Sequence, residues 1–364
     1  MKAAFIAVLI ILIIAVACKL TVKKANAAAN RDEHSDTSDL PTGALYPVAI
    51  KSKWGYINNH LSIHITPAYE SAADFSEGLA AVSKLDENGS HELYAYINTS
   101  GKAITGFIYD RVMPFREGYA VVVKNKLFGF IDSTGKEIIP CKYQEASRFS
   151  EGLACVKIND KNGFIDKSGN LVIQPSFSRA CWVSDFSEGL AAVYTGDDNP
   201  GGFINKKGEW VIPPVYSFIS AFSEGLAVVK KELSSRYGFI NLKGEMVIPE
   251  TYTDGLSFHE GVATVKISGP ADATTFAIID KSGKQIVKDL PYLFTGIFVE
   301  GMAGVQNENH LWGFIDKSGT EVIKPAFAGV SLFHNGLARM GTGSLFKGLK
   351  TIYINKTGKI VWKE

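Results

Sequence analysis

The sequence has few cysteines and almost no net charge. Only 4 of its 364 residues are cysteine, and no two have the C-x-x-C spacing that is typical of zinc sites. Lysine and arginine number 38, against 37 aspartate and glutamate residues. No basic excess is therefore present to neutralise phosphates, and we expect no nucleic-acid partner.

Sequence motifs of common enzymes are also missing. No glycine-rich phosphate loop is followed by a helical pattern, and no G-x-S-x-G elbow occurs. The seven histidines are scattered, and His60 and His64, four residues apart, have no third metal ligand nearby in the sequence. The sequence therefore predicts no catalytic, cofactor-binding or metal site, and we expect the protein not to be an enzyme.

The N-terminus carries the one long apolar run. Lys2 is followed by fifteen apolar residues, Ala3 to Ala17, and then by Cys18. Such a helix spans roughly 22 Å, less than the ~30 Å of a hydrocarbon core, and one positive charge before a short apolar run is typical of an export signal. The end of the run, AVAC, resembles a bacterial lipobox, which implies lipidation at Cys18. An uncleaved anchor and an ordinary signal peptide remain alternatives.

Three segments follow from this composition. Residues 1–18 form the signal, residues 19–43 are polar, lack strand periodicity and form a flexible tether, and residues 44–364 form the folded array. The array is expected outside the cytoplasm, held to a membrane by the N-terminal lipid or anchor. In a Gram-negative cell this means the outer membrane or the periplasmic face. Cys141, Cys155 and Cys181 are expected to be buried free thiols, with a Cys141–Cys155 disulfide as the alternative.

One octamer recurs along the chain. FSEGLAVV at 222–229 has close copies beginning at 75, 149 and 186, and weaker copies at 115, 258, 298 and 333. A second mark, Gly-Phe-Ile-Asp or a variant, accompanies it, giving nine copies that begin near 46, 79, 119, 153, 190, 226, 262, 302 and 337. The conserved pair of the octamer stands at Glu77, Gly78, Glu117, Gly118, Glu151, Gly152, Glu188, Gly189, Glu224, Gly225, Glu260, Gly261, Glu300 and Gly301, and the last copy has Asn-Gly.

Each copy predicts a β-meander of three or four strands. In one unit, Leu226 to Lys230 and Gly238 to Asn241 are strands, and a glycine turn leads to a third, Met246 to Ile248, which Pro249 ends. Weak alternation in LAVV indicates strands covered on both faces. One unit is too small to bury a core, so equivalent residues pack between neighbours. The glycine supplies a turn, and the glutamate is expected to accept hydrogen bonds from a neighbouring turn rather than to bind a ligand.

The ordered marks KWGYIN at 53 and LWGFID at 311, with Ser-Gly, Val-Ile-Pro and FSEGLA, resemble the bacterial WG (KWG) repeat family over about 44–364. The resemblance implies a bacterial protein with a repeated β array and no assigned chemistry. The fold is expected to be all-β. A propeller-like ring is favoured over an open β-solenoid because the unit has the size of a propeller blade, although nine copies exceed the usual four to eight.

Length differences between copies gather at one junction, after the LAVV strand. Insertions on one face of a repeat array often mark its binding face. The candidate binding rim consists of Asn88, His91, Asp197, Asp198, Arg236, Asp272, Asn309 and Lys347. The sequence therefore favours a non-enzymatic binding or scaffold protein whose partner is an unknown protein. The alternative is a glycan- or peptidoglycan-binding module of the cell envelope, in which Trp182, Trp210 and Trp362 stack on sugars.

Overall fold

The computed structural model describes residues 40–177, 183–195, 200–231, 236–268, 274–344 and 348–364. Within these ranges the chain forms strands, turns and loops, and no helix. The nine repeats of the sequence correspond to nine successive meander units, numbered 1 to 9 below. Cys18 and Cys181 lie outside the described residues.

Units 1 to 3 contain β1 (Leu45–Ile50), β2 (Lys53–Asn58), β3 (Ile63–Tyr69), β4 (Leu79–Leu85), β5 (Glu92–Asn98), β6 (Arg111–Val112), β7 (Tyr119–Lys124), β8 (Leu127–Asp132) and β9 (Glu137–Tyr143). Units 4 to 6 contain β10 (Glu145–Ala146), β11 (Leu153–Ile158), β12 (Lys161–Asp166), β13 (Leu171–Phe177), β14 (Leu190–Tyr194), β15 (Gly201–Asn205), β16 (Trp210–Ile219), β17 (Leu226–Lys231), β18 (Tyr237–Asn241) and β19 (Met246–Tyr252). Units 7 to 9 contain β20 (Asp254–Gly255), β21 (Val262–Ser268), β22 (Thr274–Asp280), β23 (Gln285–Leu290), β24 (Phe294–Val299), β25 (Met302–Gln306), β26 (Trp312–Asp316), β27 (Glu321–Phe327), β28 (Gly329–Val330), β29 (Leu337–Ser344), β30 (Gly348–Asn355) and β31 (Ile360–Lys363).

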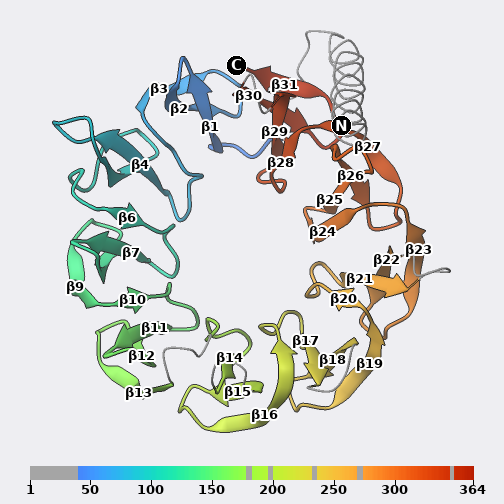
Figure 1. Cartoon of the computed structure of the whole chain (residues 1–364). Coiled ribbons are helices and arrows are strands. Elements are labelled where there is room, and N and C mark those ends of the chain that lie inside the picture. The colour runs from blue at the N-terminus through green and yellow to red at the C-terminus, as the bar shows by residue number, and fades with distance from the viewer. Residues whose placement is uncertain (1–39, 178–182, 196–199, 232–235, 269–273, 345–347) are drawn as a thin grey trace, which may run out of the picture.

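The units stand side by side around a closed ring, as in a β-propeller (Figure 1). Eight antiparallel sheets are present in the described residues, and the six-stranded one holds units 5 and 6, because β16 continues from the outer edge of unit 5 to the inner edge of unit 6. Short strands such as β20 and β28 face the ring axis, and β13, β19 and β23 lie on the outside (Figure 1). The predicted all-β array of three- to four-stranded meanders in a ring is confirmed, and the solenoid is excluded.

The hydrophobic core lies between units rather than within them. In seven of the nine units, the aromatic residue of the Gly-Phe-Ile-Asp strand packs against the octamer phenylalanine of the next unit, as Phe130 does against Phe149 and Phe203 against Phe222, with ring centroids 4.8 and 4.7 Å apart. Such pairs contribute about 0.5–1.5 kcal/mol beyond the burial of area. Each strand of the LAVV type is buried on both faces, as its weak alternation predicts. No unit therefore has a complete core of its own.

Unit 9 meets unit 1 to close the ring. Leu40, Tyr46 and Val48 form one buried cluster with Leu337 and Tyr353. Two hydrogen bonds cross this contact: the Tyr46 hydroxyl donates to the Asn335 carbonyl at 2.7 Å, and the Tyr353 hydroxyl donates to the Pro47 carbonyl at 2.8 Å. Leu40, which precedes the predicted start of the array at 44, is also part of this core.

The prediction that Pro249 ends the third strand is wrong. Strand β19 continues past it to Tyr252, with a register shift against β18 at this point. The shift is a bulge in the outermost strand of the unit, where a missing N–H donor is tolerated. The bulge brings the chain so close to Gly238 that a Cβ there would lie 2.6 Å from the Ile248 carbonyl oxygen. This contact explains the glycine of the Gly-Phe-Ile-Asp mark.

Substitution of Gly238 by alanine is expected to lower the free energy of unfolding by about 1–3 kcal/mol, because the bulge has no room for a methyl group. The control is Gly255→Ala, where the nearest atom to the new Cβ is 3.6 Å away, an ordinary contact. The urea concentration at the midpoint of unfolding measures the stability of each variant. Equal midpoints for the two variants would contradict the proposed role of the bulge.

Candidate functional site

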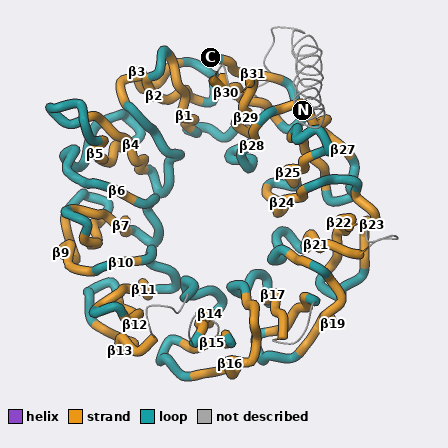
Figure 2. Tube along the Cα trace, viewed as in Figure 1, coloured by secondary structure: helices purple, strands orange, loops and turns teal. Residues whose placement is uncertain are grey.

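The meander gives the ring two different faces. Successive hairpin connections of an antiparallel meander alternate between its two ends. One end, the turn face, holds the octamer turns (150–153 and their equivalents) and the glycine turns that follow the Gly-Phe-Ile-Asp strands (166–170 and their equivalents). The other end, the loop face, holds the connections that follow the LAVV strands and the crossings between units. Figure 2 shows how loops and turns alternate with strands around the ring.

Each octamer turn is a two-residue type I′ hairpin turn. Ser150 and Leu153 exchange two backbone hydrogen bonds of 2.9 and 3.2 Å, and between them Glu151 and Gly152 have φ values of 53° and 86°. Positive φ at both central positions defines this turn and is why Asn-Gly is its preferred sequence. The N–H groups of the two central residues have no acceptor within such a turn, so they are available to another group.

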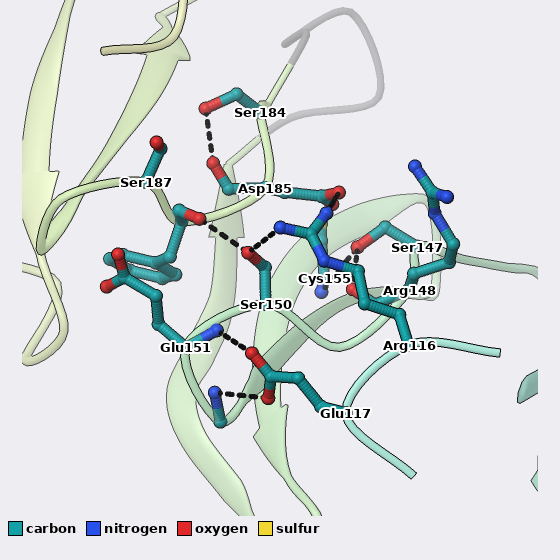
Figure 3. A network of polar contacts seen from close by, with 12 residues as sticks. Arg116, Glu117, Ser147, Arg148, Ser150, Glu151, Cys155, Ser184, Asp185 and Ser187 are labelled. Carbon is teal, nitrogen blue, oxygen red and sulfur yellow. Dashed lines mark hydrogen bonds and ion pairs between the residues drawn. The ribbon is translucent and has the colours of Figure 1, made fainter. Parts of the chain in front are cut away.

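That group is the glutamate of the preceding unit. The Glu117 carboxylate accepts from the N–H groups of Glu151 and Gly152 at 2.5 and 3.0 Å (Figure 3). The arrangement repeats seven times, and this acceptor role is the one that the sequence predicts for the glutamates. The bonds, each of 2.8 to 3.0 Å, run from the amides of Gly118, Gly152, Gly189, Gly225, Gly261, Gly301 and Gly336 to Glu77, Glu117, Glu151, Glu188, Glu224, Glu260 and Glu300. We call this series the carboxylate relay.

Lysines reinforce the relay at five of its positions. The lysine that follows the Gly-Phe-Ile-Asp strand of one unit pairs with the relay glutamate of the unit before it, as Lys167 does with Glu117 at 3.2 Å. The other four pairs are Lys206–Glu151, Lys281–Glu224, Lys317–Glu260 and Lys356–Glu300. All five lysine side chains are more than one third exposed, so each pair adds at most about 1 kcal/mol.

A second series of bonds links the same turns, and Arg116 interrupts it. In units where serine follows the octamer phenylalanine, its hydroxyl donates to the phenylalanine carbonyl of the next unit, as Ser150 does to Phe186 at 2.7 Å. Arg116 occupies this serine position in unit 3. Its guanidinium donates to the Ser150 hydroxyl at 2.8 Å and lies 3.6 Å from the Asp185 carboxylate, two units away (Figure 3).

Arg116 and Asp185 border a groove of about 860 Å³ that extends to Tyr194 and Phe218. The sequence analysis did not single out Arg116. A charged residue at a position that is serine in four other copies was the signal that could have identified it.

Connection lengths on the loop face differ between two parts of the ring. Units 1, 3 and 4 use two-residue turns with positive φ, such as Asn125-Lys126. Units 5 to 9, which are consecutive in the ring, and unit 2 have longer connections. We call the connections of units 5 to 9 the loop arc; they comprise residues 195–200, 232–236, 269–273, 307–311 and 345–347. Figure 1 shows units 5 to 9 as one continuous side of the ring, from β14 to β31.

The predicted rim residues divide between two places. Asn88 and His91 are exposed in unit 2, apart from the loop arc. Arg236 and Asn309 belong to the arc, and Arg236 donates to the Ser268 hydroxyl of the next unit at 3.0 Å. Asp197, Asp198, Asp272 and Lys347 belong to the arc by sequence but lie outside the described residues.

The three tryptophans of the sugar-binding alternative do not form one platform. Trp210 is 40% exposed on the outer strand β16, and Trp362 in β31 packs against Tyr353 at the ring closure. Strands β16 and β31 lie on opposite sides of the ring (Figure 1). Trp182 lies outside the described residues. Only Trp210 is therefore seen with a largely exposed ring in the part of the chain that the structure describes.

Cysteines and metal ligands contribute no further site in the described ranges. Cys141 and Cys155 are free thiols, and burial, the largest effect, raises the pKa of Cys155 to about 12. No three His, Cys, Asp or Glu side chains among the described residues are grouped to hold a metal ion. Over the same ranges, no helix is long and apolar enough to cross a membrane.

The relay makes stability depend on pH in the acid range. Burial raises the pKa of Glu117, but the amides of Gly152 and Glu151 and the Lys167 ammonium together outweigh it, so this pKa lies below its ordinary 4.5. The same balance lowers the pKa of Glu224 and of Glu260. A lowered folded pKa gives stability that is complete above pH 4.5 and is lost as pH falls through the folded value.

The triple variant Glu117→Gln, Glu224→Gln, Glu260→Gln is therefore expected to be less stable than the parent at pH 7, and the difference should shrink as pH falls below 4.5. Urea unfolding at a series of pH values measures it. Glu308→Gln, at an exposed loop residue, is the control. A difference that does not change with pH would contradict the role of ionised carboxylates.

Solved structures with a similar fold are known. The fold is similar to that of a solved eukaryotic initiation factor, with a TM-score of 0.62 and 11% identity over 88% of this chain and 96% of that chain. BamB from Moraxella catarrhalis matches with a TM-score of 0.42 and 12% identity over 88% of this chain and 95% of that one. At these identities the likeness concerns the fold alone. No curated protein sequence matches the chain.

A protein-family model described as "WG containing repeat" matches seven segments of the chain, at residues 54–87, 94–128, 128–161, 163–197, 202–232, 237–269 and 312–344. These segments make up more than half of the chain. Three of the nine structural units, 2, 7 and 9, have another residue at the position of the Gly-Phe-Ile-Asp glycine: Ala95, Ala277 and Ile352. The chain belongs to the WG-repeat family.

Proposed function

We propose that this chain is an exported, membrane-tethered binding or scaffold protein without enzymatic activity, which holds its partner with the loop arc. The observation that carries the proposal is the division of the ring into two faces. On the turn face, the same turn, the same acceptor and the same spacing recur from unit to unit. On the loop face, five consecutive units depart from the short turn that units 3 and 4 use.

The physical argument for binding is pre-organisation. Loops fixed at both ends by a rigid array lose less conformational freedom when they bind a partner. The loop arc starts and ends on strands that are buried on both faces, such as β14 and β17. Residues that contact a partner are disproportionately found on loops held by such a scaffold. We therefore place the partner, an unidentified protein, across units 5 to 9.

Export and tethering are proposed from the N-terminal sequence. The apolar run from Ala3 to Ala17 and the lipobox-like end at Cys18 support lipidation, with the ring outside the cytoplasm. The absence of enzymatic activity is proposed because the sequence carries neither a phosphate-binding loop nor a G-x-S-x-G elbow, and because two of its seven histidines are accounted for by the repeat. His259 and His334 stand in the serine position of the octamer, and their backbone groups make the ordinary turn bonds to Val262 and Leu337.

A glycan-binding role is the second candidate, and the groove beside Arg116 favours it. Its border combines the Arg116–Asp185 ion pair with the aromatic side chains of Tyr194 and Phe218. Paired charges that hydrogen-bond hydroxyl groups, next to an aromatic ring, suit a sugar. The exposed Trp210 lies in the same unit as Tyr194 but on the outer strand, so it is a separate point of contact.

Replacement of each loop-arc connection by a two-residue turn copied from Asn125-Lys126 is expected to abolish capture of an envelope protein without lowering the melting temperature. The template is the chain's own turn at this junction. Immobilised protein exposed to envelope extract, with mass spectrometry of what is retained, measures capture. The control removes charge from the turn face through Lys136→Ala and Lys243→Ala. Retention of the same protein by the short-loop variant would reject the loop arc as the binding surface.

The glycan alternative makes a different prediction. Envelope oligosaccharides should quench tryptophan fluorescence in the parent and in the short-loop variant equally, and Asp185→Ala should weaken the effect by about tenfold or more, because a charged hydrogen-bond acceptor is lost. Trp210→Phe tests whether the signal arises at the outer strand β16. If oligosaccharides change no fluorescence in the parent, the glycan role is rejected.

A further inference from the structure

The ring is irregular where unit 9 meets units 1 and 2. Units 2 to 9 each have an inner segment before the octamer turn, which in unit 2 pairs through Ala72 and Val82, whereas β1 is the first strand of unit 1 in the described residues. The carboxylate relay also stops here. The last turn is Asn335-Gly336, and the Gly78 amide of the first turn has no hydrogen-bond acceptor among the described residues.

A cavity of about 360 Å³ lies at this junction, which we call the seam cavity. Tyr46, Tyr353, Asp74, Arg339, Ser331 and His334 are among the residues that line it. The two tyrosine hydroxyls are held in place because each donates to a backbone carbonyl across the ring closure. A volume of this size corresponds to about twelve water molecules, which is enough for a ligand of about ten non-hydrogen atoms.

Arg339 departs from the repeat in a way that the fold does not need. Its guanidinium carbon lies 5.7 Å from the centroid of the Trp54 ring, and no ion pair within the described part of the chain neutralises its charge. A guanidinium remains charged at every physiological pH, so an anion beside it is favoured. The equivalent residues of the other repeats are uncharged: Ala81, Val121, Cys155, Ala192, Val228, Thr264 and Gly304.

Asp74 supplies the opposite charge on the same cavity. Its carboxylate is exposed and has no hydrogen bond or ion pair among the described residues. Arg339 and Asp74 both act on the Tyr353 hydroxyl: burial, the largest effect, raises the pKa of Tyr353, Arg339 lowers it and Asp74 raises it. The two charges therefore lie near one hydroxyl group without pairing with each other.

We propose that the seam cavity binds a small zwitterion of the α-amino acid class, with its carboxylate on Arg339 and its ammonium group on Asp74. The hydroxyl oxygens of Tyr46 and Tyr353 remain able to accept a hydrogen bond from the ammonium group, because each uses its proton elsewhere. A lone anion would leave Asp74 uncompensated, and a lone cation would leave Arg339 uncompensated. This site is independent of the loop arc, since none of the residues that line it belongs to one of the five connections of the arc.

Two variants that return the cavity to the repeat pattern test the proposal. Arg339→Val introduces the residue found at Val121 and Val228, and Asp74→Ala introduces the residue found at Ala221, so both variants are expected to fold. Arg111→Val is the matched control, because the Arg111 guanidinium also lies 5.7 Å from an aromatic centroid, that of Phe128. Each common α-amino acid is added singly to the full chain, and binding is measured by thermal shift and then by calorimetry.

We expect at least one amino acid to bind, and each seam variant to weaken it by about tenfold or more, since each removes one charged partner. Arg111→Val and the short-loop variant should bind as the parent does. Three results would overturn the proposal: no amino acid raises the melting temperature; both seam variants bind with unchanged affinity; or acetate alone binds as tightly as the amino acid, which would make the cavity a simple anion site.

Discussion

A type I′ turn leaves two backbone N–H groups without acceptors, and the rest of the ring depends on how they are satisfied. Seven of the eight octamer turns donate their glycine N–H to the glutamate of the unit before, at 2.8 to 3.0 Å, and the N–H groups of Glu117 and Glu151 donate to the same carboxylates. Glutamate is a poor residue for this turn, because positive φ costs a non-glycine residue about 1–3 kcal/mol. Charge-assisted bonds to the next unit offset that cost. The last unit has no following octamer turn, and there the chain uses asparagine, which the turn itself favours.

The difference between the uniform turn face and the variable loop face follows from this constraint. The relay, the lysines and the octamer phenylalanines all join one unit to the next, so the ring is held together by contacts between units. Since no unit buries a core alone, the array has to close, and Tyr46 and Tyr353 tie its first and last units. With the turn face fixed in this way, connections on the loop face are free to differ in length without loss of the fold.

Much of this architecture could be predicted from the sequence, because each residue of a repeat can be compared with the equivalent residues of the eight other copies. The strands, the glycine turns, the buried LAVV segments and the acceptor role of the glutamates all follow from the shared pattern. Three features could not be predicted. The bulge at Pro249 depends on how the third strand crosses Gly238, ring closure depends on the rotation between units, and the Arg116–Asp185 contact joins residues 69 apart. The predicted rim residues do not all lie together, because Asn88 belongs to unit 2. The position of unit 2 relative to the loop arc is set by the ring and could not be predicted from the repeat.

Site-resolved amide hydrogen exchange on the native chain tests the relay most directly. Eight octamer turns have the same backbone conformation, but in the described residues only the seven whose preceding unit also carries an octamer glutamate have an acceptor for the glycine N–H. The amides of Gly118, Gly152, Gly189, Gly225, Gly261, Gly301 and Gly336 are expected to exchange at least about tenfold more slowly than the amide of Gly78, which has no acceptor among the described residues. Equal exchange at Gly78 and at the other seven would contradict the account, because protection would then come from the turn alone and not from the glutamate of the preceding unit.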